Sequence, residues 1–282
     1  MRKVGLHQRI TSNLTELIKK AVHLKLPCFQ FFVTDRKTGK VINPTSQDLR
    51  TFLSYRWINF NNLYLHSSYL INLADIKRDY HPLLVRELRI AKMLECSHIV
   101  IHPGTVRTID EKNEGIDAVA RVMNYLIKRE PDIQFLLENT AFGQLAIGST
   151  IEDFHRLLTN INKPDKIGFC IDTVHAHVAG YDVVSEEGYS IFMTLLEKMI
   201  GLERIKLVHL NETRQERCSY CDVHCCIGEK GAQLKELSLK RFMGDKRLGA
   251  AEFLTELPEI SEEDECRIMD ILNTWMLQCY GE

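Results

Sequence analysis

Six short apolar runs of the sequence each end on a side chain that can bind a metal ion. A single His or Glu after an apolar run is usually a polar loop residue, but six in succession indicate a common site. Imidazoles and carboxylates gathered in a half-buried cleft would stay unsatisfied without a cation, so a metal is the simplest explanation. Mixed nitrogen and oxygen ligands suit zinc or manganese. The six residues are His66, His102, Glu138, Asp172, His209 and Glu256.

Three further candidate ligands lie in the loops beyond these runs. His175 comes three residues after Asp172, and Asp222 and His224 form a D-x-H pair. In an extended segment residues i and i+2 point to the same face, so the pair could hold one ion together. Nine candidates are too many for one metal, so the sequence predicts more than one ion.

The apolar runs predict eight strands, because each is a few residues rich in Ile, Val, Leu and Phe, as buried parallel strands are. They lie within residues 3–7, 27–33, 62–68, 98–104, 133–140, 167–173, 205–212 and 250–258. Segments with helical spacing separate them, at 11–24, 82–95, 115–130, 150–161, 189–200 and 264–280. Helix N-caps are expected at Thr11 or Ser12, at Thr45 or Ser46, and at Ser149.

Strand then helix, repeated about eight times, is the pattern of a (β/α)₈ TIM barrel, with a doubly wound open sheet as the structural alternative. Active sites of this barrel lie where the strands end, so the six strand-end residues would meet at one mouth. No Gly- or Ser-rich linker divides the chain. We therefore predict a single TIM-barrel domain over residues 1–282, with the active site at the C-terminal ends of the strands.

The composition, 45% apolar and 26% charged residues, is that of an ordinary folded protein. The net charge of −2 gives no global attraction to nucleic acid, so a polyanion would have to meet local patches or bound cations. The N-terminus has no apolar signal region and no later run is long enough for a membrane span, so we expect a cytoplasmic protein. Five of the nine cysteines are scattered singly, which suits reduced thiols.

Several motifs together resemble endonuclease IV, the zinc-dependent apurinic/apyrimidinic endonuclease: "HSSYLINLA", "IHPG", "ENTA", "CIDTVHAHVAGYD", "HLN" and "DVH". The resemblance runs from the first strand to the last. It implies three zinc ions, with Glu138 and Glu256 as catalytic carboxylates as well as ligands. The implied ligands are His66, His102 and Glu138 for one zinc, Asp172, His209 and Glu256 with a bridging Glu138 for a second, and His175, Asp222 and His224 for the third. The family reads like "LETP" where this chain has "LTELP", so Glu252 and Glu259 are rivals to Glu256.

The implied activity is cleavage of the phosphodiester 5′ to an abasic site in duplex DNA, leaving a 3′-hydroxyl and a 5′-deoxyribose phosphate. The implied partner is duplex DNA with abasic or damaged sites, with which a monomer would associate in the nucleoid. A nucleotide without its base flips out of the duplex at little cost. Tyr69 and Gln30 match positions that look like DNA contacts in the family. Arg36 and Lys37, in "TDRKTGK", would approach the backbone, or else form a solvated basic loop.

Two side chains beside the ligands are candidates for hydrogen bonds to them, and one loop departs from the family motif. Asn139 and Asn211 are expected to hydrogen-bond the ligands. The family usually reads like "GSRVDRHxxxGEG" where this chain has "CSYCDVHCCIGEK", so the arginines beside the Asp are missing. Arg214, Arg217 or Lys230 would have to supply phosphate contacts instead. Four cysteines of this loop could bind a separate zinc or be inert or redox-sensitive thiols; they are Cys218, Cys221, Cys225 and Cys226.

Two other functions compete with this interpretation. A xylose-isomerase-like sugar-phosphate isomerase or epimerase would hold one divalent ion, but it would need only four of the nine candidates, namely Glu138, Asp172, His209 and Glu256. The altered "CDVHCC" loop also permits a DNA-binding or scaffold protein that has lost catalysis. The number of bound metals and the fate of an abasic duplex distinguish the three hypotheses.

Overall fold

A computed structural model describes residues 2–77 and 81–280 of the chain. Its eight strands form a closed barrel in chain order, and each strand runs parallel to both neighbours. The last strand pairs with the first, so the predicted TIM barrel is confirmed and the open sheet is excluded. The strands are β1 (Val4–Gln8), β2 (Phe29–Phe31), β3 (Tyr64–His66), β4 (His98–Ile101), β5 (Gln134–Glu138), β6 (Ile167–Asp172), β7 (Ile205–His209) and β8 (Glu252–Thr255).

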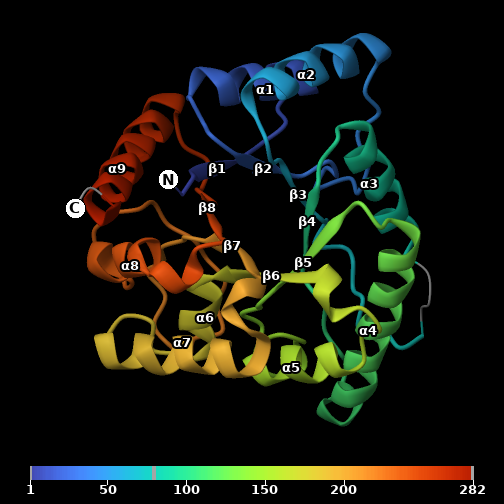
Figure 1. Cartoon of the computed structure of the whole chain (residues 1–282), viewed down its shortest axis with the longest axis vertical. Helices are drawn as coiled ribbons and strands as arrows, with labels where there is room; N and C mark the ends of the chain where they lie inside the picture. The colour runs from blue at the N-terminus through green and yellow to red at the C-terminus, as the bar shows by residue number, and fades with distance from the viewer. Residues whose placement is uncertain (1, 78–80, 281–282) are drawn as a thin grey trace.

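The helices surround the barrel, as Figure 1 shows, with α1 and α2 beside β1 and β2 and with α9 outside β8. All six predicted helical segments are helices, and the described residues form three more α-helices, one of which begins at the cap expected at Thr45 or Ser46. The helices are α1 (Leu14–His23), α2 (Ser46–Asn59), α3 (Pro82–Met93), α4 (Lys112–Arg129), α5 (Ile151–Thr159), α6 (Thr173–Ala179), α7 (Glu186–Ile200), α8 (Lys235–Gly244) and α9 (Glu262–Tyr280). Among the described residues, no helix is long and apolar enough to span a membrane.

Two of the expected N-caps differ from the structure. Helix α1 is capped by Asn13, whose side chain accepts a hydrogen bond from the Glu16 N–H at 2.9 Å, and not by Thr11 or Ser12. Thr45 caps α2 as predicted. Helix α5 begins after Thr150, while the Ser149 hydroxyl donates to the Ala146 carbonyl in the preceding loop. Ser, Thr and Asn are all favourable N-cap residues, so several neighbours are candidates in the sequence. The backbone conformation at the start of the helix determines which of them is the cap.

The core has two parts. A large cluster fills the space between the strands and the helices, and a smaller one fills the inside of the barrel. The inner cluster takes its residues from seven strands or from the positions just before them; they are Cys28, Tyr64, Val100, Leu136, Cys170, Leu207 and Leu254. Since strand side chains alternate between faces, the residue two positions further along each strand also faces the barrel axis.

Candidate metal centre

Strand alternation explains how the barrel gathers the candidate ligands. Six of them stand two residues after an inner-core residue, as Glu138 stands after Leu136 and His209 after Leu207. They therefore form the next inward layer, at the C-terminal ends of the strands. The remaining three come from the segments that follow β6 and β7. We call the nine residues the ligand cluster: His66, His102, Glu138, Asp172, His175, His209, Asp222, His224 and Glu256.

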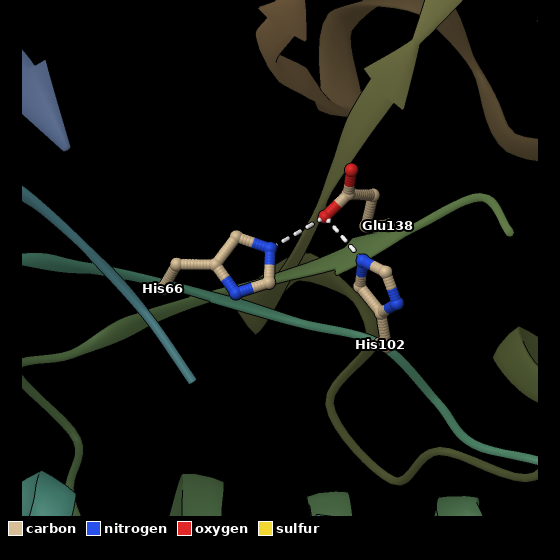
Figure 2. A group of neighbouring side chains, drawn as sticks. All are labelled: His66, His102 and Glu138. Atoms are coloured by element: carbon tan, nitrogen blue, oxygen red, sulfur yellow. Dashed lines mark hydrogen bonds and ion pairs between the residues drawn. The ribbon is translucent and has the colours of Figure 1, made fainter. Parts of the chain in front are cut away.

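The first group of the ligand cluster joins β3, β4 and β5. Glu138 Oε2 lies 2.9 Å from His66 Nε2 and 3.0 Å from His102 Nε2. Figure 2 shows both imidazoles directed at this carboxylate. All three side chains are buried. Their ligand atoms lie within 4.8 Å of one another, a spacing that allows them to hold one ion.

The second group is centred on His209 at the end of β7. Its Nδ1 lies 2.8 Å from Glu138 Oε1, 3.6 Å from Glu256 Oε2 and 3.8 Å from Asp172 Oδ2. Glu138 thus turns one carboxylate oxygen to each group, the arrangement of a bridging ligand. These four residues also have ligand atoms within 4.8 Å of one another.

The third group brings two distant segments together. Asp222 Oδ1 lies 3.2 Å from His175 Nε2 and 3.1 Å from His224 Nε2. His175 was expected in a loop, but it stands in the first turn of α6, where Asp172 caps the helix by accepting from the His175 N–H. Asp172, His175 and His224 form a further set that could hold an ion, so Asp172 lies between the second and third groups.

Side-chain charges in the ligand cluster favour cations. Burial opposes the charged form of His224, yet the neighbouring Asp222 carboxylate and the charge of Asp172 raise its pKa to about 9. Burial likewise opposes protonation of His175, but Asp172 and Asp222 raise its pKa well above the ordinary range. For Glu138 the opposing effect of burial is outweighed by His209 and His102, which lower its pKa. The carboxylates therefore stabilise positive charge at this site, as they would a divalent ion.

The histidine geometry fits metal binding. A carbonyl oxygen can only accept, so His66 and His175 carry their hydrogen on Nδ1, which donates to the Ser67 carbonyl at 2.8 Å and the Asn139 carbonyl at 2.7 Å. In the neutral ring, which is the form that binds a metal, each Nε2 then keeps its lone pair, and each lies beside a carboxylate oxygen. His102 Nε2 and His224 Nε2 are buried and make no hydrogen bond to any described residue, although each lies near a carboxylate oxygen. Imidazole nitrogens and carboxylate oxygens that converge in a buried cluster are typical of ligands to a common ion.

The structure separates Glu256 from its two rivals. Glu256 follows β8 at the mouth and contacts His209. Glu252 begins β8 at the opposite end of the barrel, where it accepts a hydrogen bond from the Tyr64 hydroxyl at 2.8 Å. Glu259 is exposed in the loop beyond. Glu256 is therefore the strand-end carboxylate within reach of the other ligands.

The two asparagines expected around the ligands do hydrogen-bond to them. Asn211 Nδ2 donates to Asp172 Oδ2 at 2.5 Å, and its Oδ1 accepts from the Glu256 N–H at 2.7 Å. Asn139 makes a pair of hydrogen bonds with the Asp172 backbone, at 2.7 and 3.1 Å. Both side chains fasten the ends of neighbouring strands, which fixes the spacing of the ligands they carry.

A cleft of about 990 Å³ opens over the ligand cluster, and His102, Asp222, His224 and Glu256 line it. Tyr69 and Arg36 line it too, and the Arg36 guanidinium lies 5.7 Å from the centre of the Tyr69 ring. Tyr69 is 44% exposed, and Arg36 and Lys37 are exposed as well. Tyr69 and Arg36 are therefore accessible to a ligand at the mouth, and Lys37 is exposed to solvent next to Arg36.

Gln30 does not share that accessibility. Its side chain is fully buried and contacts His209 and Glu256. The expected direct contact between Gln30 and DNA is inconsistent with this burial. His7, which the sequence did not single out, lies in the same layer, with Nδ1 3.5 Å from Glu256 Oε1. Its position in the run at 3–7, two residues after Gly5, was the available signal.

The loop between β7 and α8 carries the departures from the family motif. Arg214 forms an ion pair with Glu229, and Arg217 Nη1 lies 3.5 Å from Asp182 Oδ2, so acidic side chains hold both arginines. Lys230 is exposed. All nine cysteines are free thiols, and the four of this loop are absent from the groups of described residues that could hold a metal. Glu212 is buried and accepts N–H hydrogen bonds from Leu234 and Lys235, so it is a structural residue.

Comparisons with known proteins agree with this geometry. The family model of the xylose isomerase-like TIM barrel matches residues 18–248. A probable endonuclease 4 of Thermosipho melanesiensis is 29% identical over 281 residues, which cover 97% of this chain and 98% of the relative. A probable endonuclease 4 of Thermotoga neapolitana is 27% identical over 288 residues, 99% of either chain. The crystal structure of endonuclease IV from Thermus thermophilus matches with a TM-score of 0.80 and 26% identity, over 98% of this chain and 99% of that one. The resemblance to endonuclease IV is thereby confirmed.

Proposed function

The chain belongs to the xylose isomerase-like TIM-barrel family, and we propose that within it the protein is a metal-dependent endonuclease that cleaves DNA 5′ to abasic sites. The observation that carries the proposal is the set of three adjoining groups of ligand atoms at one mouth. A one-metal isomerase would need only the second group. It would leave the first and third groups without a purpose.

We assign three zinc ions to the ligand cluster. His66, His102 and Glu138 would hold the first, Asp172, His209, Glu256 and the bridging Glu138 the second, and His175, Asp222 and His224 the third. Zinc ions bound there would activate water at neutral pH and neutralise charge on the phosphate. Glu138 and Glu256 are the proposed catalytic carboxylates because each faces more than one histidine of the inner layer.

The protein's own residues would bind and orient the DNA. Tyr69 stands at the mouth with its ring centre 5.2 Å from that of His102, so a nucleotide that reached the ligand cluster would pass this ring. Arg36 and Lys37, which are exposed, would meet the phosphate backbone beside it. An unstacked abasic nucleotide enters such a cleft at lower cost than a paired one, which would give the preference for lesions. The products would carry a 3′-hydroxyl and a 5′-deoxyribose phosphate.

The proposal extends to the oligomeric state and the subcellular location of the protein. We propose that residues 1–282 act as one domain and as a monomer, since all nine ligands come from the same barrel. We also propose that the protein works in the cytoplasm, on nucleoid DNA.

The test is incision of a duplex that contains one tetrahydrofuran abasic mimic, with and without a chelator, together with the zinc content of the protein. We expect cleavage 5′ to the mimic, loss of cleavage in the chelator and close to three zincs per chain. His209→Ala should abolish cleavage. His98→Ala is the matched control, because His98 begins β4 at the other end of the barrel and should leave cleavage intact.

Other outcomes would contradict the proposal. One bound manganese or cobalt per chain without incision would favour the sugar-phosphate isomerase. Binding of the duplex by fully zinc-loaded protein without cleavage would favour a DNA-binding protein that has lost catalysis. Full cleavage by His209→Ala would contradict the ligand assignment.

A further inference from the structure

The buried amide of Gln30 completes the inner layer in which the ligands lie. Gln30 stands in β2, two residues after the inner-core residue Cys28, just as the ligands stand after theirs. Its side chain is 0% exposed, so it cannot meet a substrate directly. The strand ends from β3 to β8 supply ligands, whereas β2 supplies this neutral amide. Any role of Gln30 at this site must therefore act through the residues to which its side chain is hydrogen-bonded.

Both ends of the Gln30 amide are hydrogen-bonded to the second ligand group. Gln30 Nε2 donates to Glu256 Oε1 at 2.8 Å. Because a carboxylate can only accept, this contact decides which end of the amide is nitrogen. Gln30 Oε1 then lies 3.0 Å from His209 Nε2 and accepts its hydrogen. The second hydrogen of the amide nitrogen lies toward His7 Nδ1, 2.9 Å away.

These hydrogen bonds decide which nitrogen of His209 can bind a metal. In the neutral ring, which is the form that binds a metal, the hydrogen stays on Nε2 because an amide oxygen only accepts, and Nδ1 keeps its lone pair. That Nδ1 is the atom 2.8 Å from Glu138 Oε1, within reach of Asp172 and Glu256. The same amide holds Glu256 Oε1, which leaves Glu256 Oε2 directed at His209.

We propose that Gln30 is a positioning residue for the second metal site: it selects the metal-binding tautomer of His209 and the orientation of Glu256 with one side chain. The proposal rests on the proposed metal centre but not on the identity of the substrate. Removal of such an outer hydrogen-bond partner typically lowers metal affinity by about 10- to 100-fold. The other two sites lack a contact with Gln30 in the described part of the chain, so one class of bound zinc should weaken alone.

The test is a zinc titration of metal-free protein against a chromophoric chelator, with Gln30→Leu and Gln30→Glu. Gln30→Leu removes both hydrogen bonds, and Gln30→Glu keeps an acceptor for His209 but sets a second negative charge beside Glu256. We expect both variants to bind one zinc about 10- to 100-fold more weakly and the other two as wild type does. Excess zinc should restore much of the lost activity in Gln30→Leu.

The matched control is Gln8→Leu. Gln8 is also a fully buried glutamine at a strand end, but its Nε2 donates to Glu265 on α9 at 3.3 Å and not to a ligand. The Gln8→Leu variant should bind all three zincs with wild-type affinity. Thermal unfolding of the metal-free proteins shows whether each variant is folded. If Gln30→Leu does not fold, the zinc titration of Gln30→Glu tests the proposal.

Unchanged zinc affinity in a folded Gln30 variant would overturn the proposal. So would an equal loss at every site together with a lower unfolding temperature of the metal-free form, because a general structural role would produce that result. The readout is independent of DNA: selective loss of one zinc in a protein that does not cut the abasic duplex would leave this proposal standing and defeat the proposed function.

Discussion

The two ends of the barrel differ in how the charges of their carboxylates are balanced. At the N-terminal end Glu252 accepts from the Tyr64 hydroxyl at 2.8 Å and from Asn62 at 3.3 Å, and it lies 3.4 Å from Lys3. Its charge is balanced by a permanent cation of the protein. At the C-terminal end Glu138 faces four imidazoles of the ligand cluster, at 2.8 to 3.4 Å.

This difference shows which end is built for stability and which for chemistry. Polar groups at the N-terminal end satisfy one another, so substitutions there should affect folding. Those at the C-terminal end crowd carboxylates together and leave buried imidazole nitrogens without hydrogen bonds to described residues, as at His102 and His224. Such an arrangement fits a bound cation. Four substitutions test this contrast, from the largest expected effect to the smallest.

Glu138→Gln should abolish the function of the C-terminal end. It removes the carboxylate shared by the first two ligand groups, so we expect cleavage of the abasic duplex to fall by roughly 1,000-fold or more, along with zinc content. Glu252→Gln is the matched control, since it makes the same change at the other end and should leave the cleavage rate within about twofold. The two rates are compared in one incision assay. Equal losses in both variants would erase the distinction between the two ends.

Glu87 supports the C-terminal end from α3, and there we expect a pH dependence. It accepts hydrogen bonds from the Thr34 hydroxyl and the Ser68 N–H, which lead into the loops of Arg36 and Tyr69. Burial raises the pKa of Glu87 from its ordinary 4.5 to about 7. Between these values the folded protein keeps a proton that the unfolded chain releases, so this contribution to stability is present at low pH and lost as pH rises toward 7.

Glu87→Gln should remove that contribution to the pH dependence. From the pKa difference, wild type should lose up to about 3 kcal/mol more unfolding free energy than the variant between about pH 4 and pH 8. Denaturant unfolding across this range, with and without the substitution, measures the difference. Parallel curves for the two proteins would show that Glu87 does not titrate in this window.

Glu252→Ala should cost stability and spare activity. It leaves the buried Tyr64 hydroxyl without its acceptor and Lys3 without its ion pair, so we expect a loss of about 2 kcal/mol in unfolding free energy. Urea unfolding of the metal-free protein measures this loss. Incision at a temperature where the variant is folded should match that of wild type. A stable variant with impaired cleavage would reverse the roles that we assign to the two ends.

Val223→Arg should sharpen the contrast by adding a cation at the C-terminal end. Val223 lies between Asp222 and His224 and is 50% exposed. One added phosphate contact should steepen the salt dependence of binding to undamaged duplex, with the slope of log affinity against log salt changing by about 0.9. Leu237→Arg, on the exposed surface of α8, is the control and should change the slope less. Identical slopes would mean that residue 223 does not face the DNA backbone.

Much of this protein could be predicted from the sequence because the determining pattern is local. Alternation along each strand sets a ligand two residues after an inner apolar residue, as with Leu136 and Glu138, and the repeated strand-helix pattern predicts the closed barrel. The six ligands at the strand ends can therefore be predicted from the order of residues along the chain. The third group was accessible only through the D-x-H pair and the resemblance to endonuclease IV.

The tertiary structure decided what each of these polar side chains contacts. Gln30 meets Glu256 and His209, residues far from it in the chain, and only closure of the barrel brings β2 beside β8 through β1. Glu252 and Glu256 lie at opposite ends of the extended strand β8, and the direction of that strand in the barrel places Glu256 at the mouth. A sequence specifies which donors and acceptors exist, but hydrogen bonds and metal coordination depend on distances of a few ångströms. Those distances are set only when all eight strands have packed together.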